Sequence, residues 1–438
     1  MKVIIIIICK ITRFLGKLIH RGSSLPGYIA IKLDKNILSK MTLPENIIMI
    51  TGSNGKTTTT EMIASSLSKN GYNVGTNEEG SNQIAGVATM IINNSNIFGK
   101  CKKDVLVIES DERYTKDTCK YIHPKYLIIT NLYRDQMTRN AHPESVYDSV
   151  KEAIDNKTHL ILNTDDPLSS SLGFERDNVT YVGIEKNALS TKENTSVYND
   201  GVYCPICKGK MNYDFYHFSH IGKYNCTNCN FKREKPTYKI DNIDLISGII
   251  TINGNELKLH MKGFYNAYNV LYTYSCLSLM GLEKDGILKA LDDYNIKNDR
   301  VQNFTLSKTK ATLLTSKHEN SISYNQNIDY ILRENKPFTV CFILDSISRK
   351  YFTTDTSWLW DIDFEKLDNS LVNKIVLAGK YSPDLMIRFN YTNIDKRKIV
   401  KTSDLDEMMK ILNNDESEIV YVLTCFADRM KFIERTNR

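Results

Sequence analysis

The segment Thr51–Thr58, with the sequence T-G-S-N-G-K-T-T, constrains the fold of this chain more than any other feature. An apolar run, Ile47–Ile50, precedes it and a helical pattern follows it, so we expect a strand, a tight loop and a helix in that order. Glycines allow such a loop to turn its backbone N–H groups toward a phosphate, and the N-terminus of the following helix adds a favourable dipole. The segment therefore predicts a binding site for ATP or a closely related nucleoside triphosphate.

Individual residues of this loop have distinct expected roles. Lys56 would reach the β- and γ-phosphates, and the Thr57 hydroxyl would be a ligand of Mg²⁺. The general phosphate-loop pattern requires a glycine where this chain has Ile50, so the loop is a shorter variant, T-G-x-N-G-K-T. The residues that we expect to contact the nucleotide here are Gly52, Asn54, Gly55, Lys56, Thr57 and Thr58.

Apolar runs alternate with helical patterns along most of the chain, which is typical of a largely parallel sheet covered by helices. The predicted strands are Asn46–Thr51, Asp104–Glu109, Tyr126–Thr130, His159–Asn163, Leu245–Ile252, Glu256–Met261, Ala311–Thr315, Phe338–Leu344, Lys374–Leu377, Lys398–Val400 and Ile419–Thr424. The predicted helices include Thr57–Asn70, Pro143–Asp155 and Tyr265–Met280. We expect a basic leader segment (1–45), a central ATP-binding domain (46–300) with an insert at 200–235, and a smaller Rossmann-like α/β domain (301–438).

Four of the ten cysteines stand in two tight pairs. Cys204 and Cys207 form one C-x₂-C pair, and Cys226 and Cys229 form a second after 18 intervening residues. This spacing indicates a Cys₄ zinc ribbon, in which each pair supplies two thiolates from one turn. Because four protein ligands leave no open position for water, we expect the Zn²⁺ to be structural; a redox-active dithiol is the alternative. The other six cysteines lie mostly beside apolar residues, as expected of reduced thiols in the cytoplasm.

The N-terminus, MKVIIIIICK, is apolar but short. Its run from Val3 to Cys9 is far below the roughly 20 residues that span a bilayer, and basic residues follow it instead of a small-residue cleavage site. We therefore expect a buried strand or helix start rather than a signal peptide or transmembrane segment, with a basic apolar segment on the inner membrane surface as the alternative. The net charge of +6 over 438 residues is mild and no basic arm occurs, so nucleic acid is not an expected partner.

The short phosphate loop resembles that of the Mur ligases and folylpolyglutamate synthetases, enzymes that form amide bonds through an acyl phosphate. Three more features are similar to this family: Glu109 at the end of a strand, the L-N-T-D-D-P run Leu162–Pro167, and the G-x-x-N-x-x-N helix start Gly263–Asn269. The resemblance implies that Glu109 holds Mg²⁺ with Thr57 and that Asn266 lies near the nucleotide. A solvated glutamate and helix-capping asparagines are the alternatives.

The zinc ribbon inside an ATP-binding domain narrows the resemblance to the MurT family, the synthetase subunits of lipid II isoglutaminyl synthases. Segments similar to this family are spread over nearly the whole chain: Gly22–Gly27, Asn131–Gln136, Asp355–Asp361 and, more loosely, Tyr381–Arg388. The D-T-S-W-L-W-D run from Asp355 is the most specific of them, because it contains both tryptophans. The implied fold is α/β, with a Mur-ligase-type central ATPase domain, an inserted ribbon and a smaller C-terminal domain.

In MurT-like proteins, ATP phosphorylates the α-carboxylate of the D-glutamate in lipid II, and ammonia from a separate glutaminase converts it to D-isoglutamine. The resemblance therefore implies a class I glutaminase partner of the GatD type, lipid II at the inner membrane surface as substrate, and the cofactors ATP, Mg²⁺ and Zn²⁺. It also implies catalytic roles for Lys56, Glu109 and Asp355. Asp355 would complete the Cys–His pair of the glutaminase, with Asp361 as the alternative. This chain has no glutaminase nucleophile motif of its own.

Several positions depart from the family pattern. The family's R-D-Q-x-D-R-Y-G-E reads R-D-Q-M-T-R-N-A-H at Arg134–His142, and an acidic residue is lost at two places. Of two further family segments this chain keeps Arg300 and Lys317, for which the resemblance implies nucleotide contacts. Two other functions therefore stay open: a Mur- or folylpolyglutamate-type ligase that joins an amino acid without a glutaminase, and a degenerate ATP-binding scaffold subunit.

Overall fold

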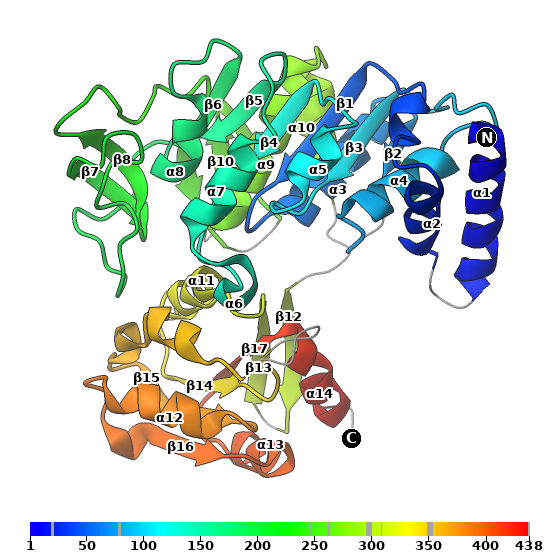
Figure 1. Ribbon diagram of the computed structural model, residues 1–438. Coiled ribbons are helices and arrows are strands. Elements are labelled where there is room, and N and C mark those ends of the chain that lie inside the picture. Colours follow the sequence, from blue (N-terminus) through cyan, green and yellow to red (C-terminus); the bar gives the residue numbers. More distant parts are fainter. Residues whose placement is uncertain are drawn as a thin grey trace. The chain divides into compact units, whose positions relative to one another are not determined.

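The computed structural model describes residues 1–18, 22–77, 80–245, 247–260, 263–294, 300–307, 309–347 and 354–436. Their contacts divide the chain into two compact units (Figure 1). Unit 1 consists of residues 1–133, 142–195 and 199–295, and unit 2 consists of residues 134–141, 196–198 and 296–438. The domain boundaries expected from the sequence, 1–45, 46–300 and 301–438, stay a prediction.

A nine-stranded sheet forms the centre of unit 1, in the order β11-β10-β9-β6-β5-β4-β1-β3-β2. The seven strands from β9 to β2 are mutually parallel, whereas β10 and β11 form an antiparallel extension. The bounds are β1 (Asn46–Thr51), β2 (Val74–Thr76), β3 (Val105–Glu109), β4 (Tyr126–Ile129), β5 (His159–Asn163), β6 (Val179–Ile184), β9 (Tyr238–Asp244), β10 (Ile249–Ile252) and β11 (Asn255–Lys258). Because β1 lies between β3 and β4, the loops after these three strands meet at one edge, where parallel sheets bind ligands.

Helices cover both faces of this sheet (Figure 1). They are α1 (Lys2–Leu18), α2 (Leu25–Leu33), α3 (Lys56–Lys69), α4 (Ile84–Asn93), α5 (Thr115–Cys119), α7 (Pro143–Lys151), α8 (Pro167–Ser170), α9 (Tyr265–Leu279) and α10 (Lys284–Asp292). Alternate residues of β1 divide between the faces: Ile47 and Met49 join a core cluster with Ile91 of α4. The buried Ile48 and Ile50 belong to the opposite face, and α3 and α9 pack against each other and against the sheet.

The two cysteine pairs belong to an insert between β6 and β9 (Figure 1). Its hairpin, β7 (Met211–Phe218) and β8 (Ile221–Cys226), is antiparallel. A small core of its own stabilises the insert, formed by Cys204, Met211, Tyr224, Cys226 and Phe231. This arrangement confirms the prediction of an α/β domain with an inserted Cys₄ ribbon.

Unit 2 has a second, six-stranded sheet in the order β12-β13-β17-β14-β15-β16. Only the edge strand β12 pairs antiparallel among these strands; the others are parallel. The strands are β12 (Val301–Leu306), β13 (Thr309–Ser316), β14 (Phe338–Ile343), β15 (Val372–Ala378), β16 (Ile399–Thr402) and β17 (Ile419–Cys425). The helices are α6 (Met137–Asn140), α11 (Ser321–Ile331), α12 (Ser382–Asn390), α13 (Leu405–Asn413) and α14 (Phe426–Thr436), with the 3₁₀ helices η3 (Ser357–Asp361) and η4 (Phe364–Leu367). Apolar clusters on both faces of the sheet confirm the predicted second α/β domain.

One local expectation changes, and another reaches beyond the described residues. The predicted strand Leu245–Ile252 is wrong at its start, because the chain reverses there between β9 and β10. Gly248 has a left-handed backbone (φ +70°), and the Ser247 N–H donates to the Asp244 carboxylate at 3.2 Å, which closes the turn. Of the predicted strand Glu256–Met261, Met261 lies outside the described residues.

The N-terminal apolar run lies within α1. The sequence allowed either a buried strand or the start of a helix for this run, and the structure has a helix there. Among the described residues, no helix is both long enough and apolar enough to cross a membrane.

Candidate active site

The phosphate loop connects β1 to α3 in unit 1. Gly55 directly precedes the helix and has a left-handed backbone (φ +84°). A Cβ atom at this position would come within 2.3 Å of the Asn269 side-chain oxygen. Position 55 therefore requires glycine both for its backbone conformation and for the close approach of α9.

The segment after β4 holds this loop in place. The Asn131 side chain accepts the Asn54 N–H at 2.8 Å and donates to the Asn54 carbonyl at 3.0 Å. The Ser53 hydroxyl donates to the Tyr133 carbonyl at 3.1 Å and accepts the Tyr133 N–H at 2.9 Å. These four bonds fix the loop backbone, so little ordering is required when a phosphate binds.

Lys56 is buried, and its ammonium group lies 2.8 Å from a carboxylate oxygen of Glu112. It also donates to the Gly52 carbonyl. Glu112 is buried as well, so the pair is largely screened from water. Glu112 was not among the residues predicted from the sequence, although it lies three residues after Glu109 in the run E-S-D-E. Phosphate oxygens entering the loop would compete with Glu112 for this ammonium group.

The structure brings Glu109 and Thr57, the two expected Mg²⁺ ligands, into contact. The Thr57 hydroxyl donates to Glu109 Oε2 at 2.8 Å, and the Asn82 amide donates to Oε1 at 2.9 Å. Asn77 holds the Glu109 backbone by accepting its N–H at 2.9 Å. Oxygen ligands of one octahedral Mg²⁺ lie about 3 Å apart, so the hydroxyl and carboxylate fit such an ion.

Asn266 and Asn269 lie at the start of α9 and are both buried. The Asn269 amide donates to the Asn266 side-chain oxygen at 3.1 Å, and the Thr59 hydroxyl donates to Asn269 at 3.3 Å. Since Asn269 also contacts the loop at Gly55, the structure brings Asn266 to the phosphate loop through its neighbour. Thr58 lies in the first turn of α3.

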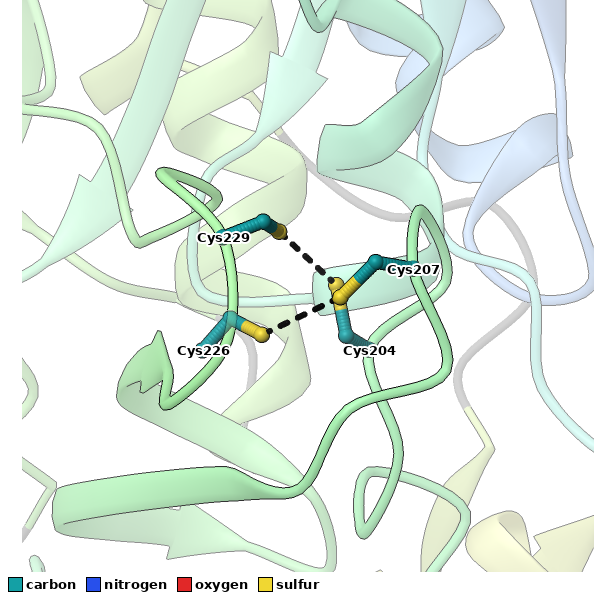
Figure 2. A group of neighbouring side chains, drawn as sticks. All are labelled: Cys204, Cys207, Cys226 and Cys229. Carbon is teal, nitrogen blue, oxygen red and sulfur yellow. Dashed lines mark hydrogen bonds between the residues drawn. The ribbon is translucent and has the colours of Figure 1, made fainter.

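The four paired cysteines form a compact cluster (Figure 2). The Sγ atoms of Cys204 and Cys229 are 3.7 Å apart, and those of Cys207 and Cys226 are 3.5 Å apart. Four thiolates at about 2.3 Å from one tetrahedral Zn²⁺ would be roughly 3.8 Å from each other, so the spacing fits the metal. The backbone N–H of Gly209 and the Asn228 amide donate to Cys207 at 3.4 Å and 3.6 Å, and these bonds, with those to the neighbouring thiols, lower the pKa of Cys207 to about 6.

A buried ion pair joins this ribbon to the ATPase sheet. The Arg233 guanidinium donates to the Asp165 carboxylate at 2.6 Å, and the Tyr268 hydroxyl of α9 donates to the same carboxylate at 2.8 Å. The Ile184 N–H, at the end of β6, adds a bond of 2.7 Å. Burial alone would lower the pKa of Arg233, but the charge of Asp165 raises it. Arg233, which follows the second cysteine pair by four residues, was not predicted from the sequence.

Unit 2 contains a second polar cluster around the buried Asp135. Lys317 forms an ion pair with Asp135, and the Asn320 amide donates to the other carboxylate oxygen at 2.9 Å. Glu319 accepts the Thr138 hydroxyl at 2.5 Å. Burial raises the pKa of Glu319, and the negative charges of neighbouring aspartates add to this effect. Lys317 is thus held by Asp135, a residue of the segment Arg134–His142 that departs from the family pattern.

Asp355 lies two residues before η3 and Asp361 is its last residue, and the two carboxylates have different surroundings. Asp361 accepts the Arg134 guanidinium at 2.9 Å, and Arg134 also stacks over the Tyr198 ring at 4.3 Å. Asp355 is exposed, and its carboxylate accepts the Ser357 N–H at 2.8 Å.

The remaining predicted site residue, Arg300, also belongs to unit 2. Its guanidinium lies over the Phe426 ring, 5.3 Å from the ring centroid. Unit 1 thus brings together Lys56, Thr57, Glu109 and, through Asn269, Asn266, whereas Arg300, Lys317 and Asp355 lie in unit 2.

Comparisons with known proteins agree with this arrangement. The Mur ligase middle domain matches residues 50–231, and the MurT ligase C-terminal domain matches residues 318–428. The chain is 33% identical to the lipid II isoglutaminyl synthase (glutamine-hydrolyzing) subunit MurT of Staphylococcus aureus (strain COL), over 98% of this chain and 95% of that subunit.

Two solved structures show the same fold. Pseudomurein peptide ligase type C from Methanothermus fervidus has a TM-score of 0.71 at 20% identity, covering 92% of this chain and 80% of that one. MurF ligase from Thermotoga maritima, in complex with ADP, has a TM-score of 0.62 at 15% identity, covering 93% of this chain and 83% of that one.

The parallel sheet, the short phosphate loop and the pairing of Glu109 with Thr57 define an ATP-dependent ligase of the Mur ligase class. Within that class the sequence match extends through both units and includes the ribbon. The chain belongs to the MurT family.

Proposed function

We propose that this chain is the synthetase subunit that amidates the D-glutamate α-carboxylate of lipid II to D-isoglutamine. ATP would activate the carboxylate as an acyl phosphate, and a separate class I glutaminase subunit of the GatD type would supply the ammonia. The observation that carries the proposal is the constellation of Lys56, Thr57 and Glu109 at the phosphate loop, in a chain related to MurT over nearly its whole length.

A carboxylate is a poor electrophile until it is phosphorylated, so the reaction requires charge neutralisation during phosphoryl transfer. Lys56 would bind the β- and γ-phosphates, and the backbone N–H groups of the loop would orient them. Thr57 and Glu109 would hold Mg²⁺, which supplies charge stabilisation when bound. Arg300 and Lys317 stay proposed nucleotide contacts.

The separate glutaminase needs a third residue that orients its catalytic histidine. We assign this role to Asp355, because its side chain is exposed, whereas the Asp361 side chain is only 21% exposed. Exposed aromatic rings lie on the same unit: Trp360, five residues after Asp355 in the sequence, packs against Tyr391 with the ring centroids 5.1 Å apart. Large exposed aromatic side chains are typical of protein interfaces.

The cysteine cluster supports a structural Zn²⁺, because four thiolates leave no ligand position for substrate. The chain would work in the cytoplasm at the inner membrane surface, where lipid II presents its head group. Nucleic acid is not part of the proposed reaction.

The test is reconstitution with the cognate glutaminase, ATP, glutamine and lipid II, followed by mass spectrometry of the peptide stem. Amidated product is expected, and Lys56→Ala should abolish it. Lys69→Ala, at the other end of the same helix, is the matched control and should keep activity. Amidation that survives Lys56→Ala would overturn the mechanism.

Two further arms separate the rival functions. Amide formation with a free amino acid and without glutaminase would indicate a ligase that acts alone, and no amide product under any condition would indicate a scaffold. Asp355→Asn should abolish glutaminase activity of the complex, whereas Asp361→Asn should leave most of it. Glutaminase activity that is indifferent to Asp355→Asn would overturn the assignment of Asp355.

A further inference from the structure

Helix α1 has an apolar face on each side. One face is buried, where Ile5, Ile6 and Cys9 join the core of unit 1. The other face is exposed and is formed by Ile4, Ile7, Ile8, Ile11, Phe14, Leu15 and Leu18, which are 37–72% exposed. These seven residues, the α1 face, recur every three or four positions and occupy an arc of roughly 120° on a helix with 3.6 residues per turn.

More exposed apolar side chains lie on the element that packs beside α1. Leu25, Tyr28 and Leu33 of α2 are 42–57% exposed. Figure 1 shows α1 and α2 side by side, and the Arg13 guanidinium donates to the Gly22 carbonyl just before α2 at 3.3 Å. Soluble monomers rarely expose apolar side chains in such a continuous stripe, so we expect another molecule or a membrane to cover this surface.

The charge around α1 indicates what that occupant is. Residues 1–44 contain eight lysine and arginine residues and one acidic residue, Asp34. Their net charge of +7 exceeds the +6 of the whole chain, so the rest of the protein is close to neutral. Helix α1 has no acidic residue. Lys10 and Lys17 lie beside one edge of the α1 face, and Arg13 lies farther round the same side of the helix.

We propose that the α1 face is a membrane-binding surface that takes a bilayer rich in anionic lipids. An apolar stripe beside lysines and arginines is the pattern of a helix that lies in the plane of the interface. The 17 residues of α1 extend about 26 Å, less than the roughly 30 Å of a hydrocarbon core, and four of them are basic, so α1 lies on the bilayer and does not cross it.

Other occupants fit less well. A second copy of the chain would bring an equally positive surface against this one, and like charges would repel. The proposed contact with the glutaminase, Asp355, lies in unit 2, whereas α1 belongs to unit 1. A membrane-binding surface deepens the proposed function, because the enzyme would be bound to the same membrane as its substrate. This part of the inference rests on the proposed function.

Vesicle sedimentation of the purified full-length chain tests the surface without catalysis. The chain should sediment with vesicles of phosphatidylglycerol and phosphatidylethanolamine and much less with phosphatidylcholine alone. The variant Ile7→Glu/Ile11→Glu/Leu15→Glu should lower binding at least tenfold, and Lys17→Glu should lower it severalfold. Ile387→Glu/Met430→Glu, at positions 55% and 52% exposed in unit 2, is the matched control and should bind as the parent does. The circular dichroism spectrum of each variant should match that of the parent.

Three outcomes would overturn the proposal: no sedimentation with anionic vesicles, equal binding by the triple variant and the control, or loss of a dimer or of glutaminase binding in the triple variant. Amidation assays separate this surface from the proposed function. The triple variant should amidate a water-soluble, short-chain lipid II analogue as the parent does, and vesicle-embedded lipid II much more slowly. A parent chain that binds vesicles but amidates neither substrate contradicts the proposed function and leaves the membrane surface standing.

Discussion

The Arg233 guanidinium donates to the Asp165 carboxylate at 2.6 Å, and both side chains are almost completely buried. Arg233 follows the second cysteine pair of the ribbon, and Asp165 lies in the loop after β5. The pair therefore fixes the ribbon to the ATPase sheet by a charge–charge contact that water does not reach.

Replacing Arg233 with methionine should destabilise unit 1, because a buried carboxylate would lose its main counter-charge. Breaking one partner of a buried ion pair costs about 3–5 kcal/mol. Chemical denaturation followed by circular dichroism should show this loss. Lys232→Met, the neighbouring exposed position, should change stability little. Equal stability of both variants would show that the ion pair contributes nothing net.

Substituting Gly55 with alanine should abolish nucleotide binding, because the new Cβ would come within 2.3 Å of Asn269 and the backbone there is left-handed. Gly71 is the matched control: it also has a positive φ (+89°), but no atom lies within 4 Å of a Cβ built there. Gly71→Ala should cost about 1 kcal/mol in stability and leave ATP affinity unchanged. Isothermal titration with ATP and Mg²⁺ distinguishes the two, and similar affinity in both variants would contradict the steric argument.

Glu112→Gln should destabilise the nucleotide-free chain and increase the stabilisation that ATP provides. The buried Lys56 charge would lose its 2.8 Å partner in the empty state, whereas bound phosphates would restore the compensation. Thermal melts with and without ATP should therefore show a larger upward shift for the variant than for the parent. In Lys56→Met/Glu112→Gln the larger shift should disappear, since no buried ammonium group is left to compensate.

Metal analysis should find one zinc per chain, and Cys204→Ser should remove it. The ribbon core includes Cys204 and Cys226, so loss of the metal should also lower the melting temperature. Cys341→Ser is the control, because Cys341 is buried in unit 2 and distant in sequence from the cluster. Zinc retained at full stoichiometry in Cys204→Ser would contradict a Cys₄ site.

The raised pKa of Glu319 predicts a pH dependence in unit 2. Burial disfavours the charged form in the folded state, so the folded pKa lies above the ordinary value of 4.5. Its contribution to stability is therefore fully present below pH 4.5 and is lost as the pH rises through the folded pKa. Glu319→Gln, which mimics the protonated group, should therefore become more stable relative to the parent as the pH increases from 4.5 through the folded-state pKa. Denaturation at a series of pH values measures the difference, and a constant difference would contradict a shifted Glu319.

Much of the fold was readable from the sequence because its signals are local. The strand before Thr51, the glycine at position 55 and the cysteine spacing each depend on a few consecutive residues, and the structure has β1, α3 and the Cys₄ cluster there. The turn at Gly248 was missed, because the apolar residues on both sides of it read as one continuous strand.

The contacts that complete the site were not readable, because they join residues far apart in the chain. Glu112 meets Lys56 across 56 positions, and Tyr268 meets Asp165 across 103. The residues next to a charged side chain in the sequence do not identify its ion-pair partner. Likewise, the α1 run of isoleucines predicted burial, and only the structure shows that three of the five, Ile4, Ile7 and Ile8, are exposed.

The position of the ribbon between β6 and β9 has a consequence for how unit 1 folds. These two strands pair side by side, yet residues 185–237 must be traversed before the second can join the first. The entropy lost on closing such a loop grows with its length. A metal bound by both Cys204 and Cys229 would shorten the effective loop, because the residues between them would no longer add to its length. Zinc binding would therefore allow β9 to pair with the sheet sooner. Zinc supply during synthesis would then set how fast the chain reaches its nucleotide-binding form.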